Sequence, residues 1–283
     1  MRSPSDILRS VEQIAFLPPA FELIPRLLVL LQDPEGNSES LADAIRLDAG
    51  LTADVLHISN TVFFASNRRI ETLQEAIMRL GLREIYQIVT KVIASPLLGD
   101  SGQTGFQRFD LWRHSLACAV AAKILANDTG ASDPEVAFTA GLLHDVGKVV
   151  LTHALGAEYI KLADETRAAN AAFFEAEKRV LKVTHPDVGA RLLQRWKFPE
   201  SIVSAVEFHH APTAPSNRQK GLAALIYLAN VLAHRAIPQN TCPEYVALPQ
   251  PAFLRLINVS PDALDRYQAE ITEALEREEA PFR

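Results

Sequence analysis

Four short segments of the chain carry histidine and aspartate side chains that could together bind a metal ion. GLLHDVGKVVL, residues 141–151, sets His144 beside Asp145 in an otherwise apolar stretch. The other three segments are DLWRHSLACAV, THPDVGARLLQRW and IVSAVEFHHAP. Imidazole and carboxylate ligands suit iron, manganese or zinc where no thiolates are available. The candidate metal ligands are His114, His144, Asp145, His185, His209 and His210.

The adjacent pair His144–Asp145 can serve one ion only under a geometric condition. Two neighbouring residues reach the same point if they lie near a helix end, where side chains converge. Gly147 follows closely and permits a bend or a close approach of another backbone. Lys148 would then be placed to meet a phosphate oxygen. If the site is catalytic, Lys148 and Asp145 are the residues we expect to act.

Each histidine also has an ordinary structural explanation. A single histidine in an apolar helix is more often a hydrogen-bonded core residue than a ligand, and we assign His57, His153 and His234 to that group. The pair His209–His210 also fits an exposed helix C-terminus, where a cationic side chain complements the helix dipole. Spacing alone does not show that the four segments converge in space.

The elements that must position these residues are predicted to be helices. Apolar residues recur at three- and four-residue spacing in FELIPRLLVLL, LADAIRLDAGLTADVLHI and LQEAIMRLGLREIYQIV. Thr72 with Glu75 forms a capping-box pattern, and Gly81 is a plausible stop. Asp133–Pro134 and Asp110 mark further helix starts. No segment alternates with period two and no glycine-rich phosphate loop occurs, so the predicted fold class is all-α.

Composition narrows the class of protein. The chain has 283 residues, 48% of them hydrophobic, and a formal net charge of −6. A negative net charge argues against nucleic-acid binding, because a phosphate backbone favours a basic protein. The two cysteines have no CxxC spacing, which excludes a thiolate zinc site. The start of the chain does not resemble a signal peptide, and the longest apolar run, LAALIYLANVLA, is too short to span a bilayer. We expect a cytoplasmic protein with no membrane partner.

Three parts are predicted along the chain. Residues 1–98 form an N-terminal helical part, and SPLLGDSGQTGFQRF separates it from a second helical part, residues 99–236, which holds the His/Asp cluster. Residues 237–283 form a C-terminal helical extension. Its last segment, after Ser260, reads as an amphipathic helix with apolar residues at 264, 267, 271 and 275. This helix either packs on the core or pairs with a second copy of the chain, so an oligomer stays open.

The order and local context of these segments resemble the HD superfamily of metal-dependent phosphohydrolases, and more closely its HD-related output-domain branch, HDOD. The segments that carry the resemblance in the second part are WRHSLACA, AFTAGLLHDVGKVVL, HPDVGARLLQRWKFP and AVEFHHAP. FLPPAFELIPRLLVLLQD and RRIETLQEAIMRLGLREIYQIV look like the N-terminal helices of HDOD proteins, which an ordinary HD hydrolase lacks. The resemblance covers roughly residues 14–235. It implies a multi-helix HD-like bundle with an N-terminal helical subdomain.

The resemblance implies two functions of different classes. HD hydrolases hold divalent ions that activate water against a phosphate ester, whereas HDOD proteins are generally regarded as signalling modules without demonstrated hydrolase activity. Active HD enzymes supply a further aspartate after the His-His segment, and here Asn230 stands in that place. An amide oxygen can ligate a metal but brings no negative charge, so Asn230 is a weak candidate ligand.

We therefore expect a regulatory protein, non-catalytic, that acts through protein–protein interaction. Its cofactor is either none or a divalent ion (Fe, Mn or Zn) at the His/Asp cluster. The chain shows no receiver, cyclase or kinase segment, so its partner would be a signalling protein in trans. The alternative is a metal-dependent phosphohydrolase that acts on a nucleotide or cyclic nucleotide; the six retained ligands and Lys148 favour it.

Overall fold

The computed structural model describes residues 19–33, 38–62, 69–99, 108–169, 171–214, 219–237 and 249–282. Within these ranges every regular element is an α- or 3-10 helix. The prediction of an all-α fold is therefore confirmed. Two compact units make up the chain, one within residues 17–97 and 279–283, the other within 98–278 for the described residues. Residues 100–107 of the predicted linker lie outside the described ranges.

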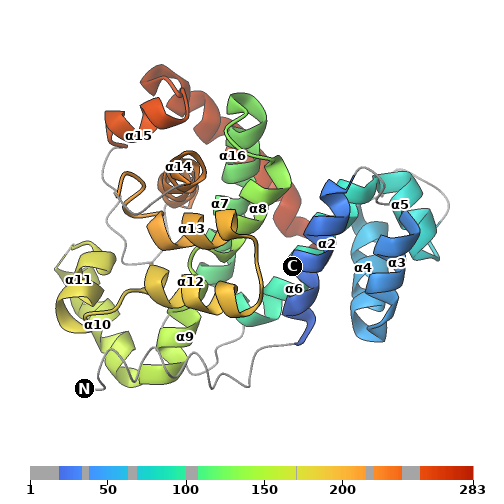
Figure 1. Ribbon diagram of the computed structural model, residues 1–283, viewed down its shortest axis with the longest axis horizontal. Coiled ribbons are helices and arrows are strands. Elements are labelled where there is room, and N and C mark those ends of the chain that lie inside the picture. Colours follow the sequence, from blue (N-terminus) through green and yellow to red (C-terminus); the bar gives the residue numbers. More distant parts are fainter. Residues whose placement is uncertain are drawn as a thin grey trace. The chain divides into compact units, whose positions relative to one another are not determined.

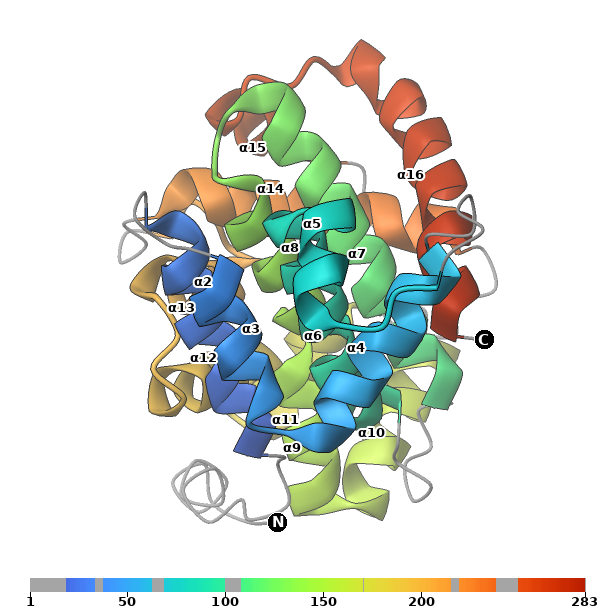
Figure 2. The same ribbon diagram turned by 90° about the vertical axis from the view of Figure 1, so that its right-hand side faces the viewer.

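The smaller unit contains five α-helices of the described chain, coloured blue to cyan in Figure 2. They are α2 (Leu23–Gln32), α3 (Ser38–Arg46), α4 (Ala49–Val62), α5 (Leu73–Leu80) and α6 (Leu82–Gly99), preceded by the 3-10 turn Pro19–Glu22. The predicted start of α5 is confirmed, because the Thr72 hydroxyl accepts a hydrogen bond from the Glu75 N–H at 3.1 Å. Its predicted end is confirmed as well: Gly81 has a φ of 86°, which a residue with a side chain rarely adopts.

The larger unit carries all the candidate ligands. Its helices are α7 (Arg108–Thr129), α8 (Pro134–Leu143), α9 (Val146–Leu155), α10 (Ala157–Ala168), α11 (Phe173–Val180), α12 (His185–Arg195), α13 (Glu200–Phe208), α14 (Lys220–Ala236), α15 (Pro251–Leu256) and α16 (Leu264–Glu279) (Figure 1). Helix α7 packs against α8 and α14, and α12 packs between α9 and α13. The core of the unit lies between these helices, and all the candidate His/Asp ligands except His210 are fully buried.

Two glycines let the helices around the site approach closely. A Cβ on Gly147 would lie 1.9 Å from the carbonyl oxygen of His185, and one on Gly141 would lie 2.8 Å from the carbonyl oxygen of Cys118. Any larger residue would push α9 away from α12, or α8 away from α7. Of the two roles expected for Gly147, the close approach is the one observed.

One helix start differs from the expected one. Helix α7 begins at Arg108, so Asp110 lies within its first turn and is not its cap. Helix α12 is capped by Thr184, which forms a full capping box with Asp187, and His185 is the first helical residue. The cap at Asp133 is as predicted, with its carboxylate accepting from two backbone N–H groups.

The last helix packs on the larger unit. Tyr267, Ile271 and Leu275 of α16 are buried, in agreement with the predicted amphipathic pattern. The Tyr267 hydroxyl and the Arg266 guanidinium both donate to the Asp128 carboxylate at the end of α7. The described chain contains no helix that is both long enough and apolar enough to cross a membrane.

Candidate metal centre

His144 and Asp145 occupy the junction between two helices. Helix α8 ends at Leu143 and α9 begins at Val146, so the pair lies at the helix end that the sequence required. The Nδ1–H of His144 donates to the carbonyl oxygen of Gly141, 2.7 Å away. Since a carbonyl can only accept, Nδ1 carries the hydrogen and Nε2 faces Asp145 inside the site.

A first triad forms around this junction. His114 comes from α7, and its Nε2 lies 3.3 Å from Nε2 of His144. The Asp145 Oδ2 lies 3.7 Å from His114 Nε2 and 3.3 Å from His144 Nε2. All three side chains are fully buried, and their ligand atoms lie within 4.8 Å of one another.

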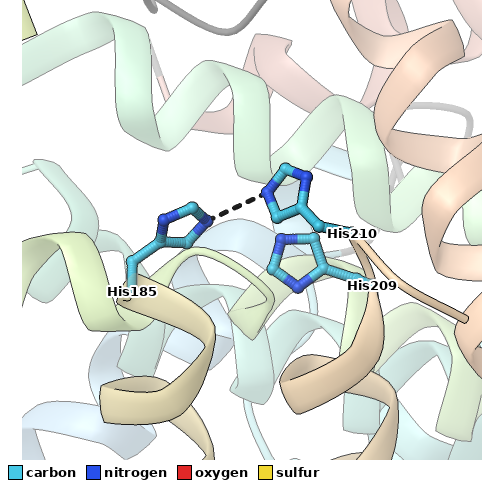
Figure 3. Close-up of side chains that lie close together, drawn as sticks. All are labelled: His185, His209 and His210. Carbon is cyan, nitrogen blue, oxygen red and sulfur yellow. Dashed lines mark hydrogen bonds between the residues drawn. The ribbon is translucent and has the colours of Figure 1, made fainter. Parts of the chain in front are cut away.

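A second triad lies beside it. Figure 3 shows His185, at the start of α12, facing His209 and His210, which follow the end of α13. The Nε2 atoms of His185 and His210 are 3.1 Å apart. The Nδ1–H of His209 donates to the carbonyl oxygen of Val206 at 2.6 Å. The ligand atoms of this triad also lie within 4.8 Å of one another.

Asp145 joins the two triads. Its Oδ2 faces His114 and His144, while its Oδ1 lies 3.2 Å from His185 Nε2 and 4.0 Å from His209 Nε2. One carboxylate thus offers an oxygen to each triad. The structure brings together all six residues that the sequence nominated as ligands.

The donor set suits divalent cations. Backbone carbonyls hold the Nδ1–H groups of His144 and His209, which turns their Nε2 lone pairs inward, and such fixing of the outer nitrogen is common for metal-binding histidines. The Nε2 of His209 is buried and has no hydrogen-bond partner among the described residues. A buried imidazole nitrogen without a partner is costly. Each triad therefore directs its ligand atoms to one point beside Asp145, and each is able to hold a metal ion.

Lys148 is also part of this cluster. Its ammonium group lies 2.8 Å from Asp145 Oδ2, and both side chains are fully buried. The lysine therefore contacts the same carboxylate oxygen that faces the first triad. Its charge partly neutralises Asp145.

Burial and charge set the pKa values of the histidines in opposite directions. Burial, together with the neighbouring His234 and His144, lowers the pKa of His114 well below its usual range. Burial also lowers the pKa of His209. Burial acts in the same direction on His185, but the Glu177 carboxylate outweighs it and raises the pKa of His185 to about 9. Neutral and protonated imidazoles therefore lie side by side in the metal-free cluster.

Three residues that sequence reasoning did not nominate contact the second triad or its support. Glu177 of α11 accepts from both the backbone N–H and the Nδ1–H of His185, at 3.0 and 2.6 Å. The hydroxyl of Tyr159 donates to the other Glu177 oxygen. The ring of Phe174 stacks on His210 with a centroid distance of 4.7 Å. The only signal for Glu177 in the sequence is weak: it lies four residues after Phe173, on the same face of the helix, but its charged neighbours favour a solvated face.

His234, which the sequence placed among the ordinary core histidines, contacts the ligand His114. Its ring lies 4.3 Å from the ring of His114, measured between centroids. Asn230, the weak candidate, is buried one turn earlier in α14, on the same helical face as His234. Asn230 therefore presents a buried, uncharged amide on this face of α14.

The model of the HDOD domain family matches residues 17–212, a span that contains all six candidate ligands. The chain belongs to the HDOD domain family. An HDOD domain protein of unknown function from Geobacter sulfurreducens has a similar structure, with a TM-score of 0.77 and 25% identity over 96% of this chain and 98% of that one.

Two relatives are similar in sequence over part of their length. An uncharacterised protein of Treponema pallidum is 30% identical over 71% of this chain and 39% of its own. A ribonuclease Y of Campylobacter hominis is 29% identical over 56% of this chain and 24% of its own. This chain therefore matches less than half the length of either relative.

Proposed function

We propose that this chain is a regulatory HDOD protein in which the two triads bind divalent metal ions as part of the structure, and that its output is contact with a signalling protein. The ions are of the iron, manganese or zinc type, since the donors are imidazoles and one carboxylate. Bound there, they would supply the positive charge that holds the ligands of α7, α12 and α13 together around Asp145.

The observation that carries this proposal is the burial of the ligand set. Five of the six candidate ligands have 0% of their surface exposed, as does the neighbouring Lys148, and only the ligand His210 is partly exposed. The five are His114, His144, Asp145, His185 and His209. A hydrolase must admit a phosphate ester and a water molecule to its metal. Here the carboxylate that joins the triads is enclosed and is contacted by Lys148. The neutral Asn230 in place of a further acid supports the same conclusion.

A metal-dependent phosphohydrolase is the second candidate function. It is favoured by the paired triads, because two adjacent ions that share a carboxylate can together stabilise the attacking and leaving oxygens of a phosphate ester. A nucleotide or cyclic nucleotide is the substrate class to test, and the similarity to a ribonuclease Y adds RNA to the screen.

Hydrolysis assays on metal-loaded protein distinguish the two candidates. The protein, loaded separately with Mn²⁺, Fe²⁺ and Zn²⁺, is incubated with bis(4-nitrophenyl) phosphate, cyclic nucleotides and an RNA oligonucleotide. The regulatory proposal expects no turnover above that of the Asp145→Asn variant. Metal-dependent turnover that Asp145→Asn abolishes would favour the hydrolase.

The regulatory output requires its own test. The protein is expressed with an affinity tag, and the proteins that copurify are compared between wild type and His144→Ala by quantitative mass spectrometry. A signalling protein enriched with the wild type alone, and then reconstituted from purified components, is the expected result. Equal binding of that partner by metal-loaded and metal-free protein would contradict a role for the metal centre in the output.

A further inference from the structure

We infer that α11 controls the second triad: Glu177 and Phe174 are positioning residues for His185 and His210, so the two metal sites differ in what holds their ligands. This inference rests on the proposed binding of metal at both triads. It assigns a role to a helix whose sequence, FFEAEKRV, shows no ligand pattern.

Glu177 is the main contact between α11 and the triad. It is fully buried, and one of its oxygens accepts from the His185 backbone N–H at 3.0 Å and from His185 Nδ1–H at 2.6 Å. Both the position and the ring orientation of His185 are therefore fixed by one carboxylate. With Nδ1–H engaged, Nε2 is left to face His210 and Asp145. A carboxylate on the outer nitrogen also makes the histidine a better electron donor to a metal.

Glu177 is itself held in place from α10. The Tyr159 hydroxyl donates to the second Glu177 oxygen, and Tyr159 has no exposed surface. The Tyr159 ring packs against Phe173 of α11, with centroids 5.3 Å apart. A chain of contacts thus runs from α10 through Glu177 to the ligand nitrogen of His185.

Phe174 makes the second contact from α11. Its ring is nearly parallel to that of His210, at an interplanar angle of 18°. Phe174 and Glu177 are three residues apart and so lie on one side of the helix. A shift of α11 would therefore move the supports of His185 and His210 together.

The first triad is supported in a different way. His144 is fixed by the carbonyl of Gly141 in α8, and Asp145 by Lys148 in the first turn of α9. His114 lies within α7, which packs against α8 and α14. None of these three supports comes from α11. Loss of the α11 contacts should weaken the second site and spare the first.

The test is a titration of Zn²⁺ into the metal-free full chain, with a chromophoric chelator as competitor, which gives the number of bound ions and the Kd of each. Wild type is expected to bind two ions. Glu177→Gln should weaken one of them by at least about tenfold, the usual effect of losing the partner of a metal-binding histidine, and leave the other within about threefold. Phe174→Ala should weaken the same ion by a smaller factor.

Double variants, in which Glu177→Gln is combined with the loss of a ligand from one triad, identify which ion is affected. In His114→Ala, where the first site is removed, Glu177→Gln should still weaken the remaining ion. In His185→Ala, Glu177→Gln should have no further effect. The matched control is Glu175→Gln, which changes an exposed carboxylate of the same helix and should leave both Kd values unchanged.

Glu177 is buried, so its replacement could impair folding; circular dichroism of the metal-free variants checks this. Tyr159→Phe keeps Glu177 and removes only the hydroxyl, and it should weaken the same ion severalfold. The inference is overturned if wild type binds two ions and these variants weaken both equally or neither. A wild type that binds no Zn²⁺, Mn²⁺ or Fe²⁺ would overturn the proposed function itself.

Discussion

Lys148 and Asp145 form a fully buried ion pair inside the ligand set, with Nζ 2.8 Å from Oδ2. Removing one partner of a buried pair leaves an uncompensated charge and costs about 3–5 kcal/mol. We expect Lys148→Met to lower the free energy of unfolding of the metal-free protein by about this amount. Saturating Zn²⁺ should restore part of it, because the ion then neutralises Asp145. Urea denaturation with and without Zn²⁺ measures both values.

The matched control for this ion pair is Lys161→Met, which removes a lysine whose side chain is 77% exposed and 3.7 Å from Glu165. It should change the free energy of unfolding by less than about 1 kcal/mol. An equal loss for Lys148→Met in the presence and absence of Zn²⁺ would show that metal does not neutralise Asp145.

Gly147→Ala should disrupt the contact between α9 and α12. The added Cβ would lie 1.9 Å from the backbone oxygen of His185, and the clash is with backbone, which cannot rotate away. We expect a loss of several kcal/mol, in the range of severe overpacking, together with loss of metal. Gly221→Ala is the control: its Cβ would meet nothing closer than 3.9 Å. Thermal unfolding of the two variants should differ by many degrees; similar melting temperatures would contradict the close approach.

The stability of the metal-free protein should fall as the pH rises. The pKa of His185 is raised from 6.5 to about 9, as burial is outweighed by Glu177. A raised pKa in the folded state contributes stability that is fully present below the unfolded value, about 6.5, and is lost as the pH rises through about 9. The melting temperature of the metal-free protein should therefore decrease across this window.

Metal should remove much of this pH dependence, because a bound ion takes the place of the proton on His185. Melting curves at pH 6, 7, 8 and 9, with chelator or with Zn²⁺, provide the comparison. Glu177→Gln should flatten the slope of the metal-free protein. A metal-free melting temperature that is constant or rises over this range would contradict the charged His185–Glu177 pair.

The hydrogen bond from Tyr267 of α16 to Asp128 of α7 can be tested separately from the metal centre. Tyr267→Phe keeps the buried ring but removes the hydroxyl that donates to Asp128. The expected cost is about 1 kcal/mol, the usual net value of such a hydrogen bond. Hydrogen exchange of the α16 amides should accelerate by about fivefold, while α12 and α13 should exchange at wild-type rates. The control is Glu270→Gln, which changes an exposed residue of the same helix. Equal acceleration in both variants would show that the Tyr267–Asp128 hydrogen bond does not hold α16 in place.

Much of the ligand set could be predicted because its signals are local. His144–Asp145 lies in an apolar run, and Gly147 follows Asp145 by two residues. The sequence predicted that Gly147 could allow a close backbone approach, and α9 and α12 approach closely there. His209 was predictable only as one of a pair near a helix end. That its Nε2 turns inward depends on a hydrogen bond to Val206, which side-chain spacing does not reveal.

The supports of the site were harder to predict because they come from other helices. Glu177 lies among charged residues in FFEAEKRV, where a solvated face is the ordinary expectation, yet it is fully buried against His185. His234 resembles any histidine near a helix end, and only the packing of α14 on α7 brings it to His114. Contacts of this kind depend on how distant helices pack, and the spacing of residues along the sequence does not predict them.

Elemental mass spectrometry of the purified protein, without chelator or a histidine tag, tests the metal centre most directly. We predict close to two iron, manganese or zinc ions per chain, reduced by both His144→Ala and His185→Ala, with loss of both ions in Asp145→Ala because its carboxylate faces both triads. A protein that is folded and free of these metals, and that takes up none when they are added, would contradict the metal centre and leave the His/Asp cluster as a hydrogen-bonded part of the core.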